Sequence, residues 1–217
     1  MPTNRLPMLI LVMSVVYLFI IPDQPFIFTL FFKLIPMIMI IMYAFRQLFI
    51  EKSISQWLII TGLIFSIIGD ATLHWFIIGL IAFLIGHLFY TAGFLARWTF
   101  SWIRFAMIIP IAGYAILIGR EMVTALNNGG EEGLMVPVIL YIIVIAFMAW
   151  AAVMTGNLWA ILGGVLFVIS DSILAWNMFV SPIANSGVLV MVPYYTAQFL
   201  IAHSLGTIRG QKRRIVW

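Results

Sequence analysis

Two carboxylates occur in this chain where burial makes them costly. Asp70 lies in the apolar stretch "FSIIGDATLHW", and Asp171 lies in the similar stretch "FVISDSILAW" about a hundred residues later. In a partly dry site two carboxylates cannot both ionise cheaply, so one can act as an acid and the other, beside a cation such as Lys33, as a base. Such a pair suits protonation of a substrate and attack of water on an oxocarbenium-like cation, as in glycosidases. In an apolar setting we expect the substrate to be a lipid.

The composition places these residues in a membrane. The chain has 217 residues, of which 65% are hydrophobic and 8% charged, and its mean hydropathy is +1.18. A bilayer core about 30 Å thick needs roughly 20 apolar residues per helix. The sequence therefore predicts an all-α fold, a polytopic membrane helix bundle that forms one transmembrane domain over residues 1–217. We expect eight transmembrane helices near residues 6–21, 26–49, 55–73, 76–96, 101–120, 134–154, 157–179 and 187–208.

The positive charges predict the orientation. One side of the eight-helix arrangement receives Arg5, Arg46, Lys52, Arg97, Arg104, Arg209, Lys212, Arg213 and Arg214, and the other receives Arg120, Asp23, Glu121, Glu131 and Glu132. The positive-inside rule then puts both termini in the cytoplasm, and we expect the inner (cell) membrane of a bacterium. The basic tail "RGQKRR" is read as a topology and lipid-headgroup signal, so membrane lipids rather than nucleic acid are the expected partners.

Three charges remain inside the predicted helices: Lys33, Asp70 and Asp171. An ionisable group there costs a few kcal/mol and is by default a functional-site hypothesis. At ~1.5 Å per residue, Lys33 and Asp171 lie roughly 10 to 12 Å below the outer boundary, and Asp70 is shallower. All three are expected in the outer half of the membrane. The alternative is an ion-pair cluster with a purely structural role.

Further polar side chains lie at similar depth. His87 and Tyr90 are three residues apart and Tyr194 and Gln198 are four apart, so each pair shares a helix face. Tyr195 is either part of the same site or an interfacial anchor. These side chains could meet in one pocket only if the helices pack suitably.

Two other histidines have simpler interpretations. His203 is expected to be a hydrogen-bond partner between helices, and His74 is expected to face water at a turn.

The chain also shows weak internal similarity. Aligning Asp70 with Asp171 pairs Gly62 with Gly163, Leu73 with Leu174, Trp75 with Trp176 and Pro36 with Pro137. The similarity predicts two parallel pseudo-repeats of four helices each, about 1–97 and 101–217. Because each half has an even number of helices, both carboxylates would lie on the same side of the membrane.

Several motifs, taken together, resemble those of a known family. They are "KLIP" (33–36), "GDATL" (69–73), "GHLFY" (86–90), "SDSILA" (170–175) and "YYTAQFLI" (194–201). In this order they resemble the successive motifs of the YhhN-like membrane proteins, the family of lysoplasmalogenases. The resemblance covers nearly the whole chain. This sequence has few polar residues between the motifs, which leaves the side that would bind a headgroup undefined.

The resemblance implies an enzyme without a metal or cofactor that hydrolyses the vinyl-ether bond of a lysoplasmalogen. The products would be a fatty aldehyde and glycerophosphoethanolamine or glycerophosphocholine. This hydrolysis needs one acid and one base, so we expect Asp70 and Asp171 to be catalytic. Lys33 would tune their ionisation, and the supporting residues would orient water or the ether oxygen: His87, Tyr90, Tyr194, Tyr195 and Gln198.

Three other functions fit parts of the pattern. Intramembrane Asp, Lys and His also build the proton relays of small transporters. Asp70, Asp171 and His87 are of suitable type to be ligands of a metal hydrolase, although their spacing does not favour it. A purely structural protein would leave the three buried charges unexplained.

Overall fold

A computed structural model describes residues 5–22, 24–48 and 53–207 of the protein. All regular elements in these ranges are helical. In chain order they are α1 (Arg5–Phe19), α2 (Phe26–Arg46), α3 (Ile54–Thr72), α4 (Phe76–Leu95), α5 (Trp102–Ala106), α6 (Ile108–Asn128), the 3-10 turn η1 (Glu132–Leu134), α7 (Met135–Met154), α8 (Leu158–Ala175), the π-helical turn η2 (Trp176–Val180) and α9 (Ser186–Thr207). The all-α prediction is confirmed.

Seven helices within the described ranges are long and apolar enough to cross a membrane. Three of them join two elements: α5 with α6, η1 with α7, and α8 with η2. The remaining apolar helix, α1, has only 15 residues, or about 22 Å at ~1.5 Å per residue. The seven long apolar helices make the protein a polytopic membrane protein.

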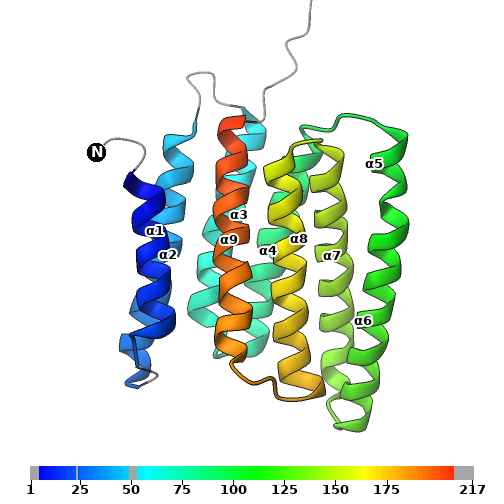
Figure 1. Ribbon diagram of the computed structural model, residues 1–217. Helices are drawn as coiled ribbons and strands as arrows, with labels where there is room; N and C mark the ends of the chain where they lie inside the picture. The colour runs from blue at the N-terminus through cyan, green and yellow to red at the C-terminus, as the bar shows by residue number, and fades with distance from the viewer. Residues whose placement is uncertain (1–4, 23, 49–52, 208–217) are drawn as a thin grey trace, which may run out of the picture.

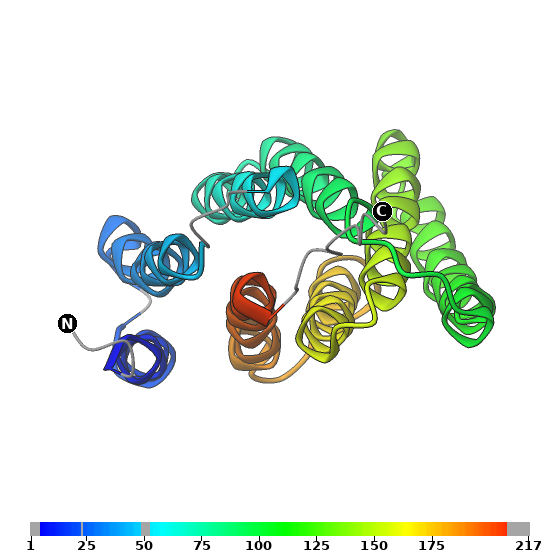
Figure 2. The same ribbon diagram turned by 90° about the horizontal axis from the view of Figure 1, so that it is seen from above.

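The helices stand side by side (Figure 1) and form an elongated array when seen from above (Figure 2). α2, α3, α4, α7, α8 and α9 pack in a closed circuit, in which each contacts the next and α9 contacts α2. α1 packs on α2 and α9 at one end of the array, and α6 packs on α7 and η2 at the other. The six helices of the circuit therefore enclose the interior that holds the polar side chains.

Local sequence signals explain several helix ends. At the start of α3, Ser53 and Gln56 form a capping box, which satisfies backbone N–H groups that a helix start leaves free. Asn157 caps α8 by accepting a hydrogen bond from Ala160 N at 3.1 Å. α6 ends where Gly130 takes a positive φ of 74°, a conformation that favours glycine.

The predicted end of the fifth membrane helix was wrong. We expected that helix over 101–120, but the segment Trp102–Asn128 is helical apart from a junction at Met107. Arg120 and Glu121 therefore lie within α6 and not in a loop. The charged pair does not break the helix, because the first strong breaker is the Gly129–Gly130 pair.

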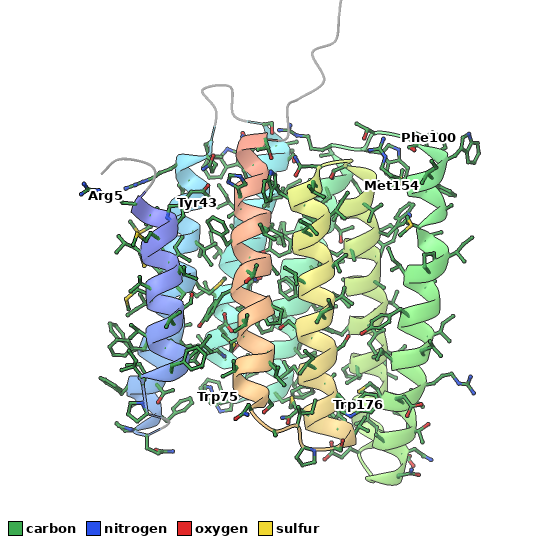
Figure 3. The ribbon with its side chains drawn as sticks, viewed as in Figure 1. Arg5, Tyr43, Trp75, Phe100, Met154 and Trp176 are labelled. Carbon is green, nitrogen blue, oxygen red and sulfur yellow. The ribbon has the colours of Figure 1, made fainter. Side chains whose placement is uncertain are left out.

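One end of the array is basic. Arg46 is the last residue of α2, and Arg97 and Arg104 lie at the same end as Arg5 and Met154. Trp75 and Trp176 mark the opposite end (Figure 3), as expected of tryptophans near a membrane boundary. Other residues used to predict orientation lie outside the described ranges: Asp23, Lys52, Arg209, Lys212, Arg213 and Arg214.

Close packing of α3 on α4 depends on Gly62. A Cβ atom at this position would overlap the ring of Tyr90, which is fully buried. We expect Gly62→Ala to lower stability by about 1–3 kcal/mol because the buried ring must move. Thermal unfolding of the purified protein in detergent measures the change.

Gly113→Ala on α6 is the matched control for this prediction, because the added Cβ would have no atom within 4 Å apart from its chain neighbours and the backbone of its own helix. Alanine there should leave the melting temperature unchanged or raise it. Equal destabilisation by the two variants would show that the Gly62–Tyr90 contact is not what limits this position.

Candidate active site

Asp70 is held by two partners from other helices. Lys33 Nζ of α2 lies 3.3 Å from Asp70 Oδ1, and Tyr194 Oη of α9 donates a hydrogen bond of 2.6 Å to Asp70 Oδ2. The side chain of Asp70 is only 3% exposed and that of Lys33 15%. A carboxylate so deeply buried needs a cation and hydrogen bonds to stay ionised. The contacts therefore make Asp70 and Lys33 a buried ion pair that joins α2, α3 and α9.

Tyr195 contacts the backbone of the lysine in this ion pair. Its Oη donates a hydrogen bond of 2.7 Å to the backbone oxygen of Lys33, and the residue is 4% exposed. The interfacial-anchor alternative for Tyr195 therefore does not hold in this fold, because a buried hydroxyl bonded to another helix fixes α9 against α2.

Asp171 belongs to a second cluster, on the side of α4, α7 and α8. Tyr141 Oη donates to Asp171 Oδ2, and His87 Nε2 lies 3.7 Å from the same oxygen and 2.9 Å from Tyr141 Oη. Because Tyr141 uses its one proton on Asp171, it accepts from His87, and this assigns a proton to Nε2. Three side chains from three helices thus form one chain of hydrogen bonds.

Tyr141 was not among the predicted site residues. It is the one polar residue of the stretch "VPVILYIIVIAF", and isolation in an apolar helix is the same signal that drew attention to Lys33. Tyrosine gives that signal weakly because much of its surface is apolar. Its position on the inward face follows only from the packing of α7 against α4 and α8.

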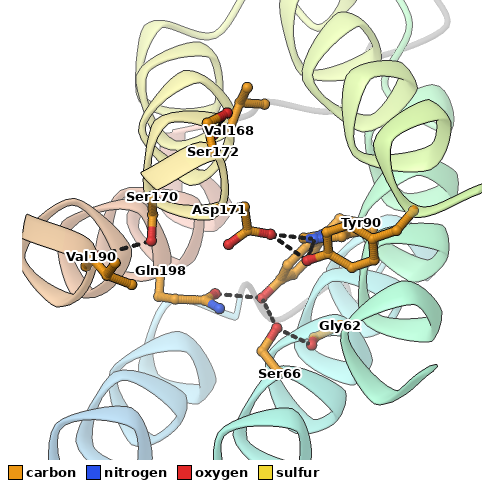
Figure 4. A network of polar contacts seen from close by, with 11 residues as sticks. Gly62, Ser66, Tyr90, Val168, Ser170, Asp171, Ser172, Val190 and Gln198 are labelled. Carbon is orange, nitrogen blue, oxygen red and sulfur yellow. Dashed lines mark hydrogen bonds and ion pairs between the residues drawn. The ribbon is translucent and has the colours of Figure 1, made fainter. Parts of the chain in front are cut away.

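A third polar network lies next to the Asp171 cluster (Figure 4). Tyr90 Oη donates to Gln198 Oε1 at 2.6 Å, and Ser66 Oγ lies 3.3 Å from Tyr90 Oη. These side chains join α3, α4 and α9. Both Tyr90 and Gln198 are fully buried, so they stabilise the interior and do not contact solvent.

One cavity of about 100 Å³ joins the first two clusters. Lys33, Asp70, Tyr141, Asp171 and Tyr194 all line it. A water molecule needs roughly 10–15 Å³ by this measure, so the cavity has room for several waters. The other predicted residues do not line the cavity. His87 contacts the lining residue Asp171, and Tyr195 donates to the backbone oxygen of the lining residue Lys33. Tyr90 and Gln198 belong to the third network.

The other polar predictions have clear structural outcomes. His203 Nδ1 lies 2.6 Å from Tyr43 Oη on α2, which confirms it as a hydrogen-bond partner between helices. His74 is exposed in the turn between α3 and α4, as predicted. Within the described residues, no three side chains of His, Asp or Glu are placed to share one metal ion.

These features define the class of protein as a polytopic, all-helical membrane protein with two carboxylates on one cavity. The chain matches the YhhN family over residues 28–205 and belongs to that family. No solved structure matches the chain at a significant level.

Several relatives share this similarity. Lysoplasmalogenase TMEM86B of Mus musculus is 30% identical over 197 residues, which cover 88% of this chain and 82% of the mouse protein. Lysoplasmalogenase TMEM86A of Homo sapiens is 30% identical over 173 residues, covering 67% of this chain and 64% of the human protein. Human lysoplasmalogenase TMEM86B is 32% identical over 146 residues, covering 66% and 61%.

The ion pair can be tested by a double-mutant cycle. Lys33→Met leaves Asp70 buried without its cation, and the loss of one partner of a buried pair costs about 3–5 kcal/mol. We expect Lys33→Met with Asp70→Asn to be less destabilised than the sum of the two single variants. Thermal unfolding of the four proteins measures the coupling, and strict additivity would contradict the ion pair.

Proposed function

We propose that this protein is a membrane hydrolase that cleaves the vinyl-ether bond of lysoplasmalogens. The observation that carries the proposal is the pair of carboxylates, Asp70 and Asp171, on one cavity with room for water. Membership of the YhhN family, whose relatives include proteins named lysoplasmalogenase, supports the choice of substrate. The products are a fatty aldehyde and a glycerophospho-alcohol such as glycerophosphoethanolamine or glycerophosphocholine.

The surroundings of the two carboxylates favour different roles. Burial of Asp70 is offset by two contacts, the cation of Lys33 and the hydrogen bond from Tyr194, and these contacts suit the role of base. Tyr141 and His87 both meet Oδ2 of Asp171, which leaves Oδ1 to carry a proton toward the cavity. In this proposal Asp171 is the acid.

The reaction then proceeds in three steps. Asp171 gives its proton to the β carbon of the vinyl ether, and the electron pair of the double bond forms the new C–H bond. A water molecule adds to the resulting oxocarbenium carbon while Asp70 takes the proton of that water. The hemiacetal collapses when its bond to the glycerol oxygen breaks: Asp70 gives its proton to the leaving glycerol oxygen, the hemiacetal hydroxyl gives its proton to Asp171, and the aldehyde is released with both carboxyl groups restored to their starting states.

The depth of the site below the membrane boundary suits the bond that joins the headgroup of a lysolipid to its aliphatic chain. Lys33 follows the start of α2 at Phe26 by seven residues, or about 10 Å at ~1.5 Å per residue. A lysolipid whose headgroup is at the membrane boundary and whose chain lies among apolar helices would bring its ether bond to a similar depth. The same siting would disfavour a freely soluble substrate.

A small proton-coupled transporter is the second candidate. The chain from His87 through Tyr141 to Asp171 is the kind of arrangement that relays protons in membranes. Proton uptake into proteoliposomes that depends on Asp171, without any hydrolysis, would favour this function.

We also propose the finer topology. In this arrangement α1 is an eighth membrane helix, both termini are cytoplasmic, and the two halves of the chain form a parallel repeat in a bacterial inner membrane. The basic end of the array is then the cytoplasmic end. The carboxylates lie in the half of the membrane that faces away from the cytoplasm.

The catalytic roles predict that Asp70→Asn and Asp171→Asn each lower turnover of a lysoplasmalogen by about 10²–10⁴-fold, the usual contribution of a positioned acid or base. Glu121→Gln, at an exposed position on α6, is the control and should retain activity. Aldehyde release by purified, folded protein measures all three. Unchanged rates in either Asp variant would refute its role.

The topology predicts opposite accessibility at the two ends. The chain has no cysteine, so single cysteines can be introduced at the exposed positions Phe100 and Ser181. A membrane-impermeant maleimide should label Ser181→Cys in intact spheroplasts and should label Phe100→Cys only after lysis. The reverse pattern would place the basic end and the termini outside.

A further inference from the structure

Outside the cavity, α6 and α7 form an open groove of about 520 Å³, at the outer end of the array (Figure 2). Ile116 and Ile143 line it and are 61% and 59% exposed, so the groove faces the surrounding lipid. Ala115 and Ile142 line both the groove and the cavity of the carboxylates. The contact between α6 and α7 therefore separates two different sites.

Two polar side chains of α6 line the groove, Arg120 and Thr124. Both are exposed, and among the described residues neither has an ion-pair or hydrogen-bond partner. In contrast, the hydroxyls of Thr61 and Thr72 on α3 each donate to the backbone oxygen four residues earlier. A guanidinium and a hydroxyl one helical turn apart are thus free to bind a ligand, and together they suit a phosphate group.

These two side chains lie at the level of lipid headgroups. α5 and α6 form one apolar segment of 27 residues that starts with Trp102 at the basic end of the array (Figure 1). Roughly 20 residues are enough to cross the hydrocarbon core, which places the far boundary near Met122. Arg120 and Thr124 lie on either side of this level, where the phosphate groups of bilayer lipids are found.

The deeper part of the groove is apolar. Ala115 lies five residues deeper than Arg120 on α6, and Ile139 and Ile143 line the same space from α7. From Thr124 to Ala115 the groove follows α6 for nine residues, or roughly 13 Å. This depth suits the glycerol and the first carbons of an aliphatic chain, while the rest of the chain remains in the bilayer.

The charges around the groove favour a zwitterionic headgroup. Glu121 follows Arg120 on α6, and Glu131 and Glu132 come just after the end of that helix. All four side chains are exposed. The single cation attracts a phosphate, whereas the three carboxylates attract an ammonium group and repel further negative charge. A phosphate that carries an ethanolamine meets both conditions.

We infer that this groove binds one diacyl phospholipid with an ammonium headgroup, whose phosphate accepts hydrogen bonds from Arg120 and Thr124. A diacyl lipid has no vinyl ether, so the site is not the substrate site and does not rest on the proposed function. α6 buries only Met122 and Leu126, and the bound lipid adds to the few contacts that hold this helix on α7.

Native mass spectrometry of the purified full chain measures the binding. Dioleoyl phosphatidylethanolamine, dioleoyl phosphatidylglycerol and dioleoylglycerol are each titrated into the protein in detergent. We expect the highest affinity for the first lipid. The second is disfavoured by the carboxylates, and the third has no phosphate for Arg120.

A pair of charge variants tests the phosphate contact. Arg120→Gln should weaken binding of the phosphatidylethanolamine by about tenfold or more, the effect of losing a hydrogen bond to a charged group. Arg46→Gln removes the same charge from an exposed position of α2 and should leave the affinity unchanged. Thr124→Val should weaken binding less than Arg120→Gln, because a neutral hydrogen bond is the weaker of the two.

A pair of glycine variants tests the groove itself. Gly119 lines the groove, and a Cβ there meets only Ile142 Cδ1, at 4.0 Å. Gly119→Leu should therefore fill the groove and abolish lipid binding. Gly113→Leu makes the same change on the same helix outside the groove lining and should have no effect.

Three outcomes would overturn the inference. They are equal affinity for the three lipids, equal loss in Arg120→Gln and Arg46→Gln, and a lipid-free dimer that Gly119→Leu dissociates, which would show that a second copy of the chain occupies the groove. None of these measurements involves turnover. Vinyl-ether hydrolysis by the same preparation tests the proposed function separately, so either proposal can fail without the other.

Discussion

The buried ion pair between Lys33 and Asp70 constrains the rest of the molecule. A carboxylate that is 3% exposed inside an apolar helix is stable only if a cation and a hydrogen-bond donor reach it. Lys33 comes from α2 and Tyr194 from α9, so these two helices must close on α3. These contacts hold three helices of the closed circuit together. The cavity that both carboxylates share extends from the interior of the circuit to residues of α6 outside it.

The second carboxylate is held in a different way. Among the described residues Asp171 forms no ion pair with a lysine, and it shares a hydrogen-bond chain with Tyr141 and His87 instead. Two carboxylates in one cavity, one paired with a lysine and one with a tyrosine and a histidine, have the asymmetry that acid–base chemistry needs. The network of Tyr90, Gln198 and Ser66 fixes three helices beside the site and leaves the cavity lining to other residues.

The sequence was sufficient to predict the fold class and the residues that carry charge in the membrane. Lys33, Asp70 and Asp171 could be found because a charge in an apolar run is costly wherever the helix packs. Tyr141 could not be found in this way, because a tyrosine in an apolar helix costs little and its role depends on which face meets α4 and α8. The pairing of Lys33 with Asp70 rather than Asp171 likewise depends on packing. The end of α6 was mispredicted because Arg120 and Glu121 signal a boundary by their charge, whereas the backbone turns only at Gly129 and Gly130.

The most direct test of the central claim is the reaction of purified protein with a lysoplasmalogen in heavy water, beside the matching lysolipid with a saturated ether. Protonation at the β carbon predicts a fatty aldehyde that carries one deuterium on the carbon next to its carbonyl group, and no aldehyde from the saturated lipid. Absence of aldehyde from the lysoplasmalogen, with protein shown to be folded, would contradict the account. The two carboxylates would then be better explained as a proton or substrate relay.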